Sequence, residues 1–161
     1  MAKECLEGLN IQTDGVYVDA TFGGGGHSEL IVQQLGAKGR LFGFDQDKDA
    51  AENALDDERF TFVASNFQHL KRFLKLYGVQ QVDGILADLG VSSHQLDAAE
   101  RGFSYRFDMT LDMRMNQQAE RTAAQVLNAY PADELQEVFS AYGEVRNART
   151  LEQAIVGYRE G

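Results

Sequence analysis

The sequence predicts an α/β fold built on an open parallel sheet, and three features of the first 90 residues carry that prediction. Short apolar segments recur along the chain, and helical periodicity follows most of them. A run of four glycines, Gly23–Gly26, lies between the first apolar segment and the first helical one. Single aspartates, Asp45 and Asp88, stand where later apolar segments end. Strands that alternate with helices in this way form parallel sheets with right-handed crossovers and helices on both faces.

Four strands are predicted in this region, each from a short apolar run. They cover Val16–Ala20, Leu41–Asp45, Phe60–Val63 and Val82–Asp88. The fourth contains Gly84-Ile85-Leu86-Ala87, which is apolar at consecutive positions and would therefore bury both of its faces. Such strands are typical of the centre of a parallel sheet, and we expect a central position here.

Helices are expected after the first three strands, at Glu29–Leu35, Asp49–Leu55 and Leu70–Tyr77. Gly36 and Gly39 follow the first of them, and glycines commonly end helices. The third places apolar side chains at i, i+3, i+4 and i+7 counted from Leu70, which is one face of an amphipathic helix.

The pattern changes after Gly90. Residues 91–121 are irregular, and helical periodicity then returns in Ala124–Tyr130, Leu135–Tyr142 and Ala148–Tyr158. We therefore expect a Rossmann-like core over residues 1–105, and a connecting loop with an incomplete helical insertion over residues 106–161. Four strands are few for such a sheet, and the chain stops within a helical pattern, so we expect it to be part of a longer protein.

Composition is that of a globular domain of ordinary size. Of the 161 residues, 43% are hydrophobic and 25% are charged. No apolar run approaches the roughly 20 residues of a membrane span, and no secretory signal opens the chain. Cys5 is the single cysteine, which excludes an internal disulfide and suits a reducing cytosol; we expect a buried thiol. The composition thus indicates a cytoplasmic protein, with no membrane partner and no histidine or cysteine spacing for a metal site.

The charge balance argues against a general nucleic-acid binder. The chain has 15 basic and 25 acidic side chains, a net charge of -10. The basic residues after position 100 are all arginines, which are the better binders of phosphates and bases. If a polyanion binds this chain, we expect it to bind there.

The glycine run indicates a ligand that approaches the backbone closely, because glycines leave backbone amides uncovered. The spacing Gly23-x-Gly25-x-x-Ser28 lacks the third glycine of the dinucleotide-binding pattern, and the Walker pattern of nucleotide triphosphatases is absent. A tight turn without a ligand is the alternative.

Asp45 ends the second strand, about 20 residues after the glycines. An acid at this spacing accepts hydrogen bonds from ribose hydroxyls in dinucleotide-binding folds. The alternative is an N-cap for the next helix, a role that Asp47 and Asp49 could also fill. A ribose contact fits a nicotinamide dinucleotide and S-adenosylmethionine equally well.

The loop Asp88-Leu89-Gly90-Val91-Ser92-Ser93 favours S-adenosylmethionine. A methyltransferase that acts on an exocyclic amine needs oxygen acceptors for the amine N–H groups, and it needs alignment more than a strong base. Hydride transfer does not need such a loop. The alternative is that Asp88 caps the strand end and that the serines are ordinary turn residues.

Several motifs occur together and in order. They are Lys3-Glu4-Cys5-Leu6, Asp19-Ala20-Thr21-Phe22-Gly23-Gly24-Gly25-Gly26-His27-Ser28, Phe44-Asp45-Gln46-Asp47, Asp88-Leu89-Gly90-Val91-Ser92-Ser93, Glu100-Arg101-Gly102-Phe103-Ser104 and Leu111-Asp112-Met113-Arg114-Met115. The chain closely resembles the bacterial small-subunit rRNA cytosine-N4 methyltransferases, the MraW family. The resemblance implies a class I methyltransferase fold with a helical insertion, and methyl transfer from S-adenosylmethionine to N4 of a cytidine in 16S rRNA.

The resemblance also implies the site residues. Cofactor contacts would come from Gly25, Gly26, His27, Asp45, Phe67, Asp88 and Gln95. Asp45 would hold the ribose, Phe67 would lie beside the adenine, and Asp88 would be the catalytic residue, either accepting the target amine or fixing the donor. The partner would be the small ribosomal subunit, and the oligomeric state stays open.

The chain departs from the family pattern at both ends. It lacks the His-x-Pro-Val type segment that normally precedes Lys3, and it has no counterpart of the later Phe-His-Ser-Leu-Glu-Asp-Arg type motif. The alternative function is therefore a cofactor-binding fragment without catalytic activity.

The irregular stretch contains residues that would face RNA. Its arginines are Arg101, Arg106, Arg114 and Arg121, and its alternating aromatic residues are Phe103, Tyr105 and Phe107. Internal salt bridges are the alternative role for the arginines, and we expect them for at least two. The aromatic alternation is more typical of a half-buried strand than of a base-stacking surface.

Overall fold

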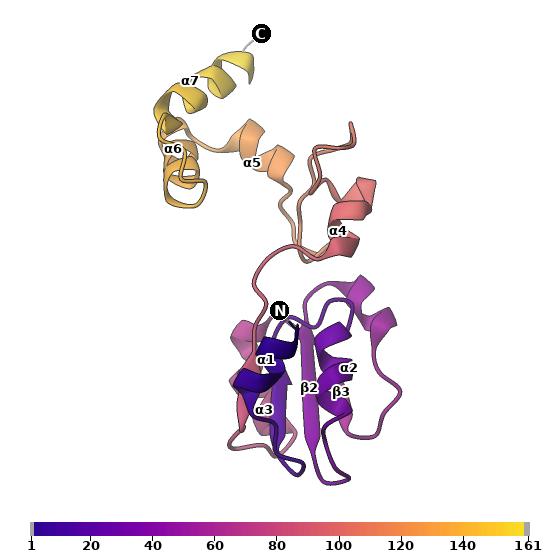
Figure 1. Cartoon of the computed structure of the whole chain (residues 1–161). Coiled ribbons are helices and arrows are strands. Elements are labelled where there is room, and N and C mark those ends of the chain that lie inside the picture. Colours follow the sequence, from indigo (N-terminus) through magenta and orange to yellow (C-terminus); the bar gives the residue numbers. More distant parts are fainter. Residues whose placement is uncertain (1, 160–161) are drawn as a thin grey trace. The chain divides into compact units, whose positions relative to one another are not determined.

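The computed structural model describes residues 2–159, which form two compact units (Figure 1). The first contains residues 2–94 together with residues 115–117, and the second contains residues 95–114 and 118–159. The boundary thus falls between His94 and Gln95, and a short later segment returns to the first unit. Each unit is described separately below.

The first unit is built on a parallel four-stranded sheet in the order β3-β2-β1-β4. The strands are β1 (Val16–Asp19), β2 (Arg40–Asp45), β3 (Phe60–Ala64) and β4 (Gly84–Leu86). Their register pairs Asp19 with both Gly43 and Leu86, so the carboxyl ends lie at one edge. The predicted α/β fold with a parallel sheet is confirmed.

The expected central position of the fourth strand is wrong for the part of the chain that the structure describes. There β4 has three residues and pairs with β1 alone. Ile85 is 51% exposed, and β4 lies at the edge of the sheet with a partner strand on one side only. The apolar run correctly predicts a strand, but its neighbours decide how much of it is buried.

Helices cover both faces of this sheet, because successive side chains of a strand point to opposite faces and those of β1 and β2 are apolar on both. They are α1 (Ala2–Leu9), α2 (Gly26–Val32), α3 (Leu70–Leu76) and the 3-10 turns η1 (Lys48–Asn53) and η2 (Phe67–His69). Tyr17 and Leu41 point into one apolar cluster with α2, whereas Val18 and Phe42 point into the other with α3. At the helix expected over Asp49–Leu55, the structure has the short 3-10 helix η1 and not an α-helix.

The second unit is helical, as expected. Its main helices are α5 (Ala123–Ala129), α6 (Ala132–Ala141) and α7 (Ala148–Arg159), preceded by the short α4 (Ser93–Asp97), which begins in the first unit, and the 3-10 turn η3 (Ala99–Arg101). A capping box formed by Thr122 and Gln125 begins α5. Arg159 donates to the carbonyls of Leu127 and Tyr130 and so satisfies the end of the same helix.

The irregular stretch is held by its arginines. Arg106 forms a salt bridge with Asp97 and Arg114 forms one with Asp112, both at 2.7 Å, so two of the four arginines pair as expected. The half-buried strand expected around Tyr105 is wrong. This residue lies in a turn and is fully exposed, because no neighbouring strand pairs with the segment in the described chain.

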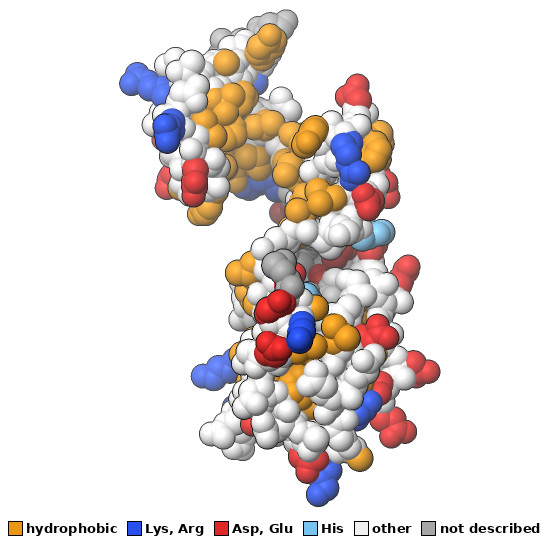
Figure 2. Space-filling view, viewed as in Figure 1, with side chains coloured by type: hydrophobic (Ala, Val, Ile, Leu, Met, Phe, Trp, Pro, Cys, Tyr) orange, Lys and Arg blue, Asp and Glu red, His pale blue; other side chains and the backbone are white. Residues whose placement is uncertain are grey.

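Exposed apolar surface occurs in both units (Figure 2). In the second unit it includes Tyr142 and Tyr158, each more than 80% exposed. Cys5 is also exposed, which corrects the expected buried thiol: it faces outward from α1. Over residues 2–159, no helix has the length and apolar character to cross a membrane.

Candidate functional site

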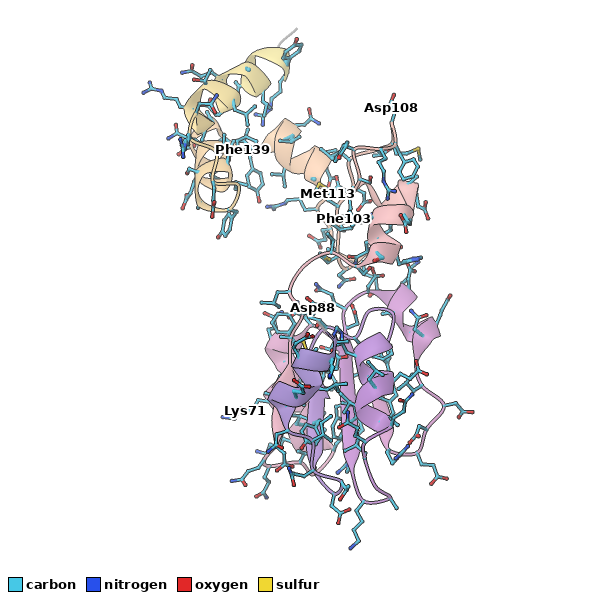
Figure 3. All side chains as sticks on the ribbon, in the orientation of Figure 1. Lys71, Asp88, Phe103, Asp108, Met113 and Phe139 are labelled. Carbon is cyan, nitrogen blue, oxygen red and sulfur yellow. The ribbon has the colours of Figure 1, made fainter. Side chains whose placement is uncertain are left out.

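Hydrogen bonds between loops join the carboxyl ends of β1, β2 and β4 into one edge. The Thr21 hydroxyl, after β1, accepts the backbone N–H of Asp88, after β4, at 2.8 Å. The Asp45 carboxylate, at the end of β2, accepts the N–H of Gly23 at 2.8 Å. Figure 3 shows Asp88 at the end of the first unit. The glycine turn is thus tied on one side to the Asp45 strand and on the other to the Asp88 loop.

The loop after β3 joins the same edge. Asn66 donates its side-chain amide to Gln46 at 2.9 Å and accepts the backbone N–H of Gln68 at 2.9 Å. Phe67 follows Asn66 and is 44% exposed. The ring predicted to lie beside an adenine is therefore open to solvent, on a loop that is anchored to the end of β2.

The glycine run forms a turn that is packed on its inner side and open on its outer side. Gly23 and Gly25 have φ values of 51° and 77°, in the left-handed region that glycine adopts readily. A Cβ on Gly25 would lie 3.0 Å from the Phe22 ring. A Cβ on Gly24 or Gly26 would meet no heavy atom within 4 Å. A ligand can therefore approach the backbone at these two positions.

A buried carboxylate lies beneath the turn. Asp19 is 1% exposed, and it accepts hydrogen bonds from the Ser28 hydroxyl at 2.8 Å and from the Thr21 N–H at 3.1 Å. Burial raises the pKa of Asp19 above its ordinary value, because the charged form loses solvation, while the two hydrogen bonds oppose this shift. Asp19 therefore holds the start of the turn and the first helical turn of α2 together.

Asp45 has a structural role in addition to any role in binding. Its two oxygens accept the backbone N–H groups of Gly23 and Asp47, both at 2.8 Å. A carboxylate offers about four acceptor positions, so capacity remains for ribose hydroxyls. Asp47, and not Asp45, caps the following helix by accepting the N–H of Asp49 at 3.2 Å. Replacing Asp45 would disturb the glycine turn as well as a bound ribose.

The other predicted site residues lie in different surroundings. His27 is half-buried in the first turn of α2, and Asp88 is exposed beyond β4. Gln95 is buried in α4 and belongs to the second unit. The glycine turn, His27, Asp45 and Asp88 thus share one edge of the first unit, whereas a contact of Gln95 with a cofactor stays a prediction.

Several residues that build this edge are not among the predicted site residues. Thr21, Gln46 and Asn66 supply its connecting hydrogen bonds. Asn66 carries a recognisable signal, because asparagine side chains commonly accept the backbone N–H of the residue two positions ahead and so cap the start of a helical turn. Thr21 carries none, because its partner is 67 residues away in sequence.

A second group of polar side chains, centred on Asp49 in η1, is also absent from the predicted site residues. Asp49 accepts the side-chain amide of Gln117 at 2.9 Å and lies 3.6 Å from the imidazole of His94. The Gln117 contact is one link that joins residues 115–117 to the rest of the first unit. Among the described residues, no group of three or more histidine, cysteine or acidic side chains is arranged to hold a metal ion.

Comparison with known proteins identifies the family. The model of the MraW methylase family matches residues 1–161. The chain belongs to the MraW methylase family. This match confirms the resemblance seen in the motifs around the glycine turn and the Asp88 loop.

Three curated relatives show how MraW methylase proteins match the chain. It is 58% identical to the ribosomal RNA small subunit methyltransferase H of Flavobacterium psychrophilum, with 99% of the chain and 55% of that protein covered. The proteins of the same name from Porphyromonas gingivalis and Bacteroides thetaiotaomicron are 61% and 55% identical, with 99% and 100% of the chain and 52% and 53% of each relative covered. The chain thus spans about half the length of these relatives.

Proposed function

We propose that this chain carries the S-adenosylmethionine-binding part of a methyltransferase that acts on N4 of a cytidine in 16S rRNA of the small ribosomal subunit. Family membership and the names of the relatives support rRNA methylation. The observation that carries the proposal is the hydrogen-bonded edge, which holds an open glycine turn between the Asp45 strand and the Asp88 loop. Such an enzyme works in the cytoplasm, where ribosomal subunits are made.

The residues present fit an adenosyl cofactor. The open positions Gly24 and Gly26 leave room for a ligand against the backbone. Asp45 keeps acceptor capacity for two ribose hydroxyls after its two backbone hydrogen bonds. The exposed ring of Phe67 offers an apolar face for an adenine. We propose that Gly25, Gly26, His27, Asp45, Phe67 and Asp88 hold this cofactor, and the contact of Gln95 that the resemblance implies stays a prediction.

The proposed chemistry asks little proton transfer of the protein. When bound, S-adenosylmethionine would supply a methyl group on a positively charged sulfur. Transfer to N4 would break the sulfur–methyl bond and leave a neutral thioether, and N4 would lose one proton to water. The lone pair of N4 is delocalised into the base, and a hydrogen bond from N4–H to the Asp88 carboxylate would localise it. Asp88 is exposed beyond the strand end and can accept such a bond. Alignment by the anchored loops would supply the rest.

Calorimetric titration of the chain with S-adenosylmethionine tests the cofactor part of the proposal. We expect saturable binding that Asp45→Ala abolishes. The matched control is Asp83→Ala. Like Asp45, Asp83 accepts a backbone N–H from a neighbouring segment, that of Val16 at 2.7 Å, but it does so at the amino ends of β1 and β4, away from the candidate site. Equal losses in both variants would indicate general damage to the sheet and would contradict a site at the carboxyl edge.

Competition and transfer assays test the remaining parts. A nicotinamide dinucleotide that displaces S-adenosylmethionine, or binds in its place, would favour an oxidoreductase domain. Incubation with labelled cofactor and undermethylated small subunits should label one cytidine at N4. Cofactor binding without such transfer would support the other candidate function, a cofactor-binding part that depends on further chain, which the half-length match to the relatives favours.

A further inference from the structure

The hydrogen bond between Thr21 and Asp88 replaces a regular bond of the sheet. At the end of the β1–β4 ladder, Ala20 donates its N–H to the carbonyl of Leu86 at 2.8 Å. In a regular parallel ladder of this register, the N–H of Asp88 would donate to the carbonyl of Ala20. It donates instead to the Thr21 hydroxyl at 2.8 Å. A side chain thus controls the path of the backbone from Asp88 onward.

The backbone of Thr21 is itself held by a hydrogen bond to the buried Asp19 carboxylate. Its N–H donates to Asp19 Oδ1 at 3.1 Å, and Asp19 Oδ2 accepts the hydroxyl of Ser28 at 2.8 Å. Asp19 and Ser28 are both almost fully buried. A chain of hydrogen bonds therefore runs from the base of α2 through Asp19 and Thr21 to the backbone of Asp88.

The side chains at the start of the loop beyond this bond are exposed. Leu89 is 72% exposed and Asp88 is also exposed, so little packing restrains either side chain. The loop approaches the glycine turn again at Ser92, whose Cβ would lie 4.0 Å from a Cβ on Gly23. The Thr21 hydroxyl thus provides the directional contact at the point where the loop leaves the sheet.

We infer that Thr21 is a positioning residue that sets Asp88 against bound S-adenosylmethionine. This inference rests on the proposed function, because it requires Asp88 to contact the cofactor. The hydroxyl accepts the Asp88 N–H and thereby fixes the Cα from which the carboxylate extends. Thr21 does not need to touch the cofactor for this role.

A double-mutant cycle on cofactor affinity tests the inference. The variants are Thr21→Val, which keeps the side-chain shape and removes the acceptor, Asp88→Ala, and the combination of both. Thr21→Ser restores the acceptor, and Thr61→Val in β3 controls for loss of a half-buried threonine hydroxyl away from the site. Calorimetry with S-adenosylmethionine gives the dissociation constants, and thermal unfolding reports stability.

We expect Asp88→Ala to weaken binding by about 10- to 30-fold, the effect of losing a hydrogen bond to a charged group. Thr21→Val should weaken binding by about 3- to 10-fold in the parent chain and by less than about 2-fold in the Asp88→Ala background. Thr21→Ser and Thr61→Val should bind like the parent. The melting temperature should change little in Thr21→Val, because water can reach the exposed loop amide.

Three outcomes would overturn the inference. These are unchanged affinity in Thr21→Val, an equal loss in the Asp88→Ala background, and failure of Thr21→Ser to restore binding. Amide hydrogen exchange provides a second readout that needs no ligand: the Asp88 amide should exchange faster in Thr21→Val and at the parent rate in Thr21→Ser. Absence of cofactor binding in the folded parent chain would instead overturn the proposed function, and this assignment with it.

Discussion

The ionised form of Asp19 is destabilised in the folded chain. It is buried beneath the glycine turn, and burial raises its pKa. The folded chain therefore binds this proton more tightly than the unfolded chain does. The contribution of Asp19 to the free energy of unfolding is therefore greatest below about pH 4, the ordinary pKa of the group. It falls as the pH rises through the higher pKa that Asp19 has in the folded chain.

The Asp19→Asn variant isolates this contribution. The amide can accept the Thr21 N–H and donate to the Ser28 hydroxyl, so both hydrogen bonds of the site can persist. We expect the stability of the variant relative to the parent to be highest at neutral pH and to decline as the pH is lowered toward 4. Urea unfolding at pH 7, 5.5 and 4 measures the difference, and parallel curves for the two proteins would contradict the prediction.

The predictable part of the site consists of residues with local signals. Asp45 and Asp88 could be placed because each ends an apolar run, and parallel strands bring such ends to one edge. Thr21 could not be singled out, because its role depends on the register between β1 and β4. The structural role of Asp45, which accepts an N–H from the neighbouring glycine turn, could not be predicted either.

At the scale of elements, the glycine turn allows ligand approach to be separated from folding. Gly26 begins α2, and a Cβ there would meet no heavy atom within 4 Å. Alanine favours helix over glycine by up to about 1 kcal/mol, so Gly26→Ala should match or exceed the parent in stability. The added methyl group should nevertheless weaken binding of S-adenosylmethionine by about tenfold if the cofactor lies against this backbone. Denaturant unfolding and calorimetry measure the two effects, and unchanged affinity would contradict a cofactor contact at Gly26.

The Gly25→Ala variant is the matched comparison. Gly25 has a φ of 77°, and its Cβ would lie 3.0 Å from the Phe22 ring. We expect it to lose about 1–2 kcal/mol of stability from the left-handed backbone alone, with weaker cofactor binding as a consequence. Stability near that of the parent would show that the turn can relax.

Strand positions were predictable from apolar runs, but burial and helix type were not. The run around Ile85 forms a strand as expected, yet this side chain is half exposed because β4 pairs with β1 alone in the described chain. The segment after Asp47 forms a 3-10 helix whose first turn is capped by that aspartate. The burial of Ile85 thus depends on neighbouring elements, whereas the 3-10 helix begins with a cap from the segment itself.

At the scale of the whole molecule, the two units are not two consecutive pieces of sequence. Residues 115–117 belong to the first unit although residues on either side belong to the second. Gln117 makes this link by donating to the Asp49 carboxylate at 2.9 Å. No local pattern in the sequence predicts such a return, because it depends on a contact between residues 68 positions apart.

The Gln117→Ala variant tests the link. Loss of this hydrogen bond should cost about 0.5–1.5 kcal/mol and should shift the amide resonances around Asp49, far away in sequence. Gln118→Ala, one position further and in the second unit, is the comparison. Two-dimensional amide spectra of the three proteins measure the effect; shifts around Asp49 of the same size in both variants would contradict a specific role for Gln117.

The hydrogen bonds across the carboxyl edge have a thermodynamic consequence for recognition. Thr21 with Asp88, Asp45 with Gly23, and Asn66 with Gln46 are joined by bonds internal to the protein. Loops held in this way have already lost much of the conformational entropy that a mobile binding surface would lose on association. A ligand that fits this edge would then bind in a single fast step whose rate is set by diffusion and collision geometry, without a slower phase for loop ordering.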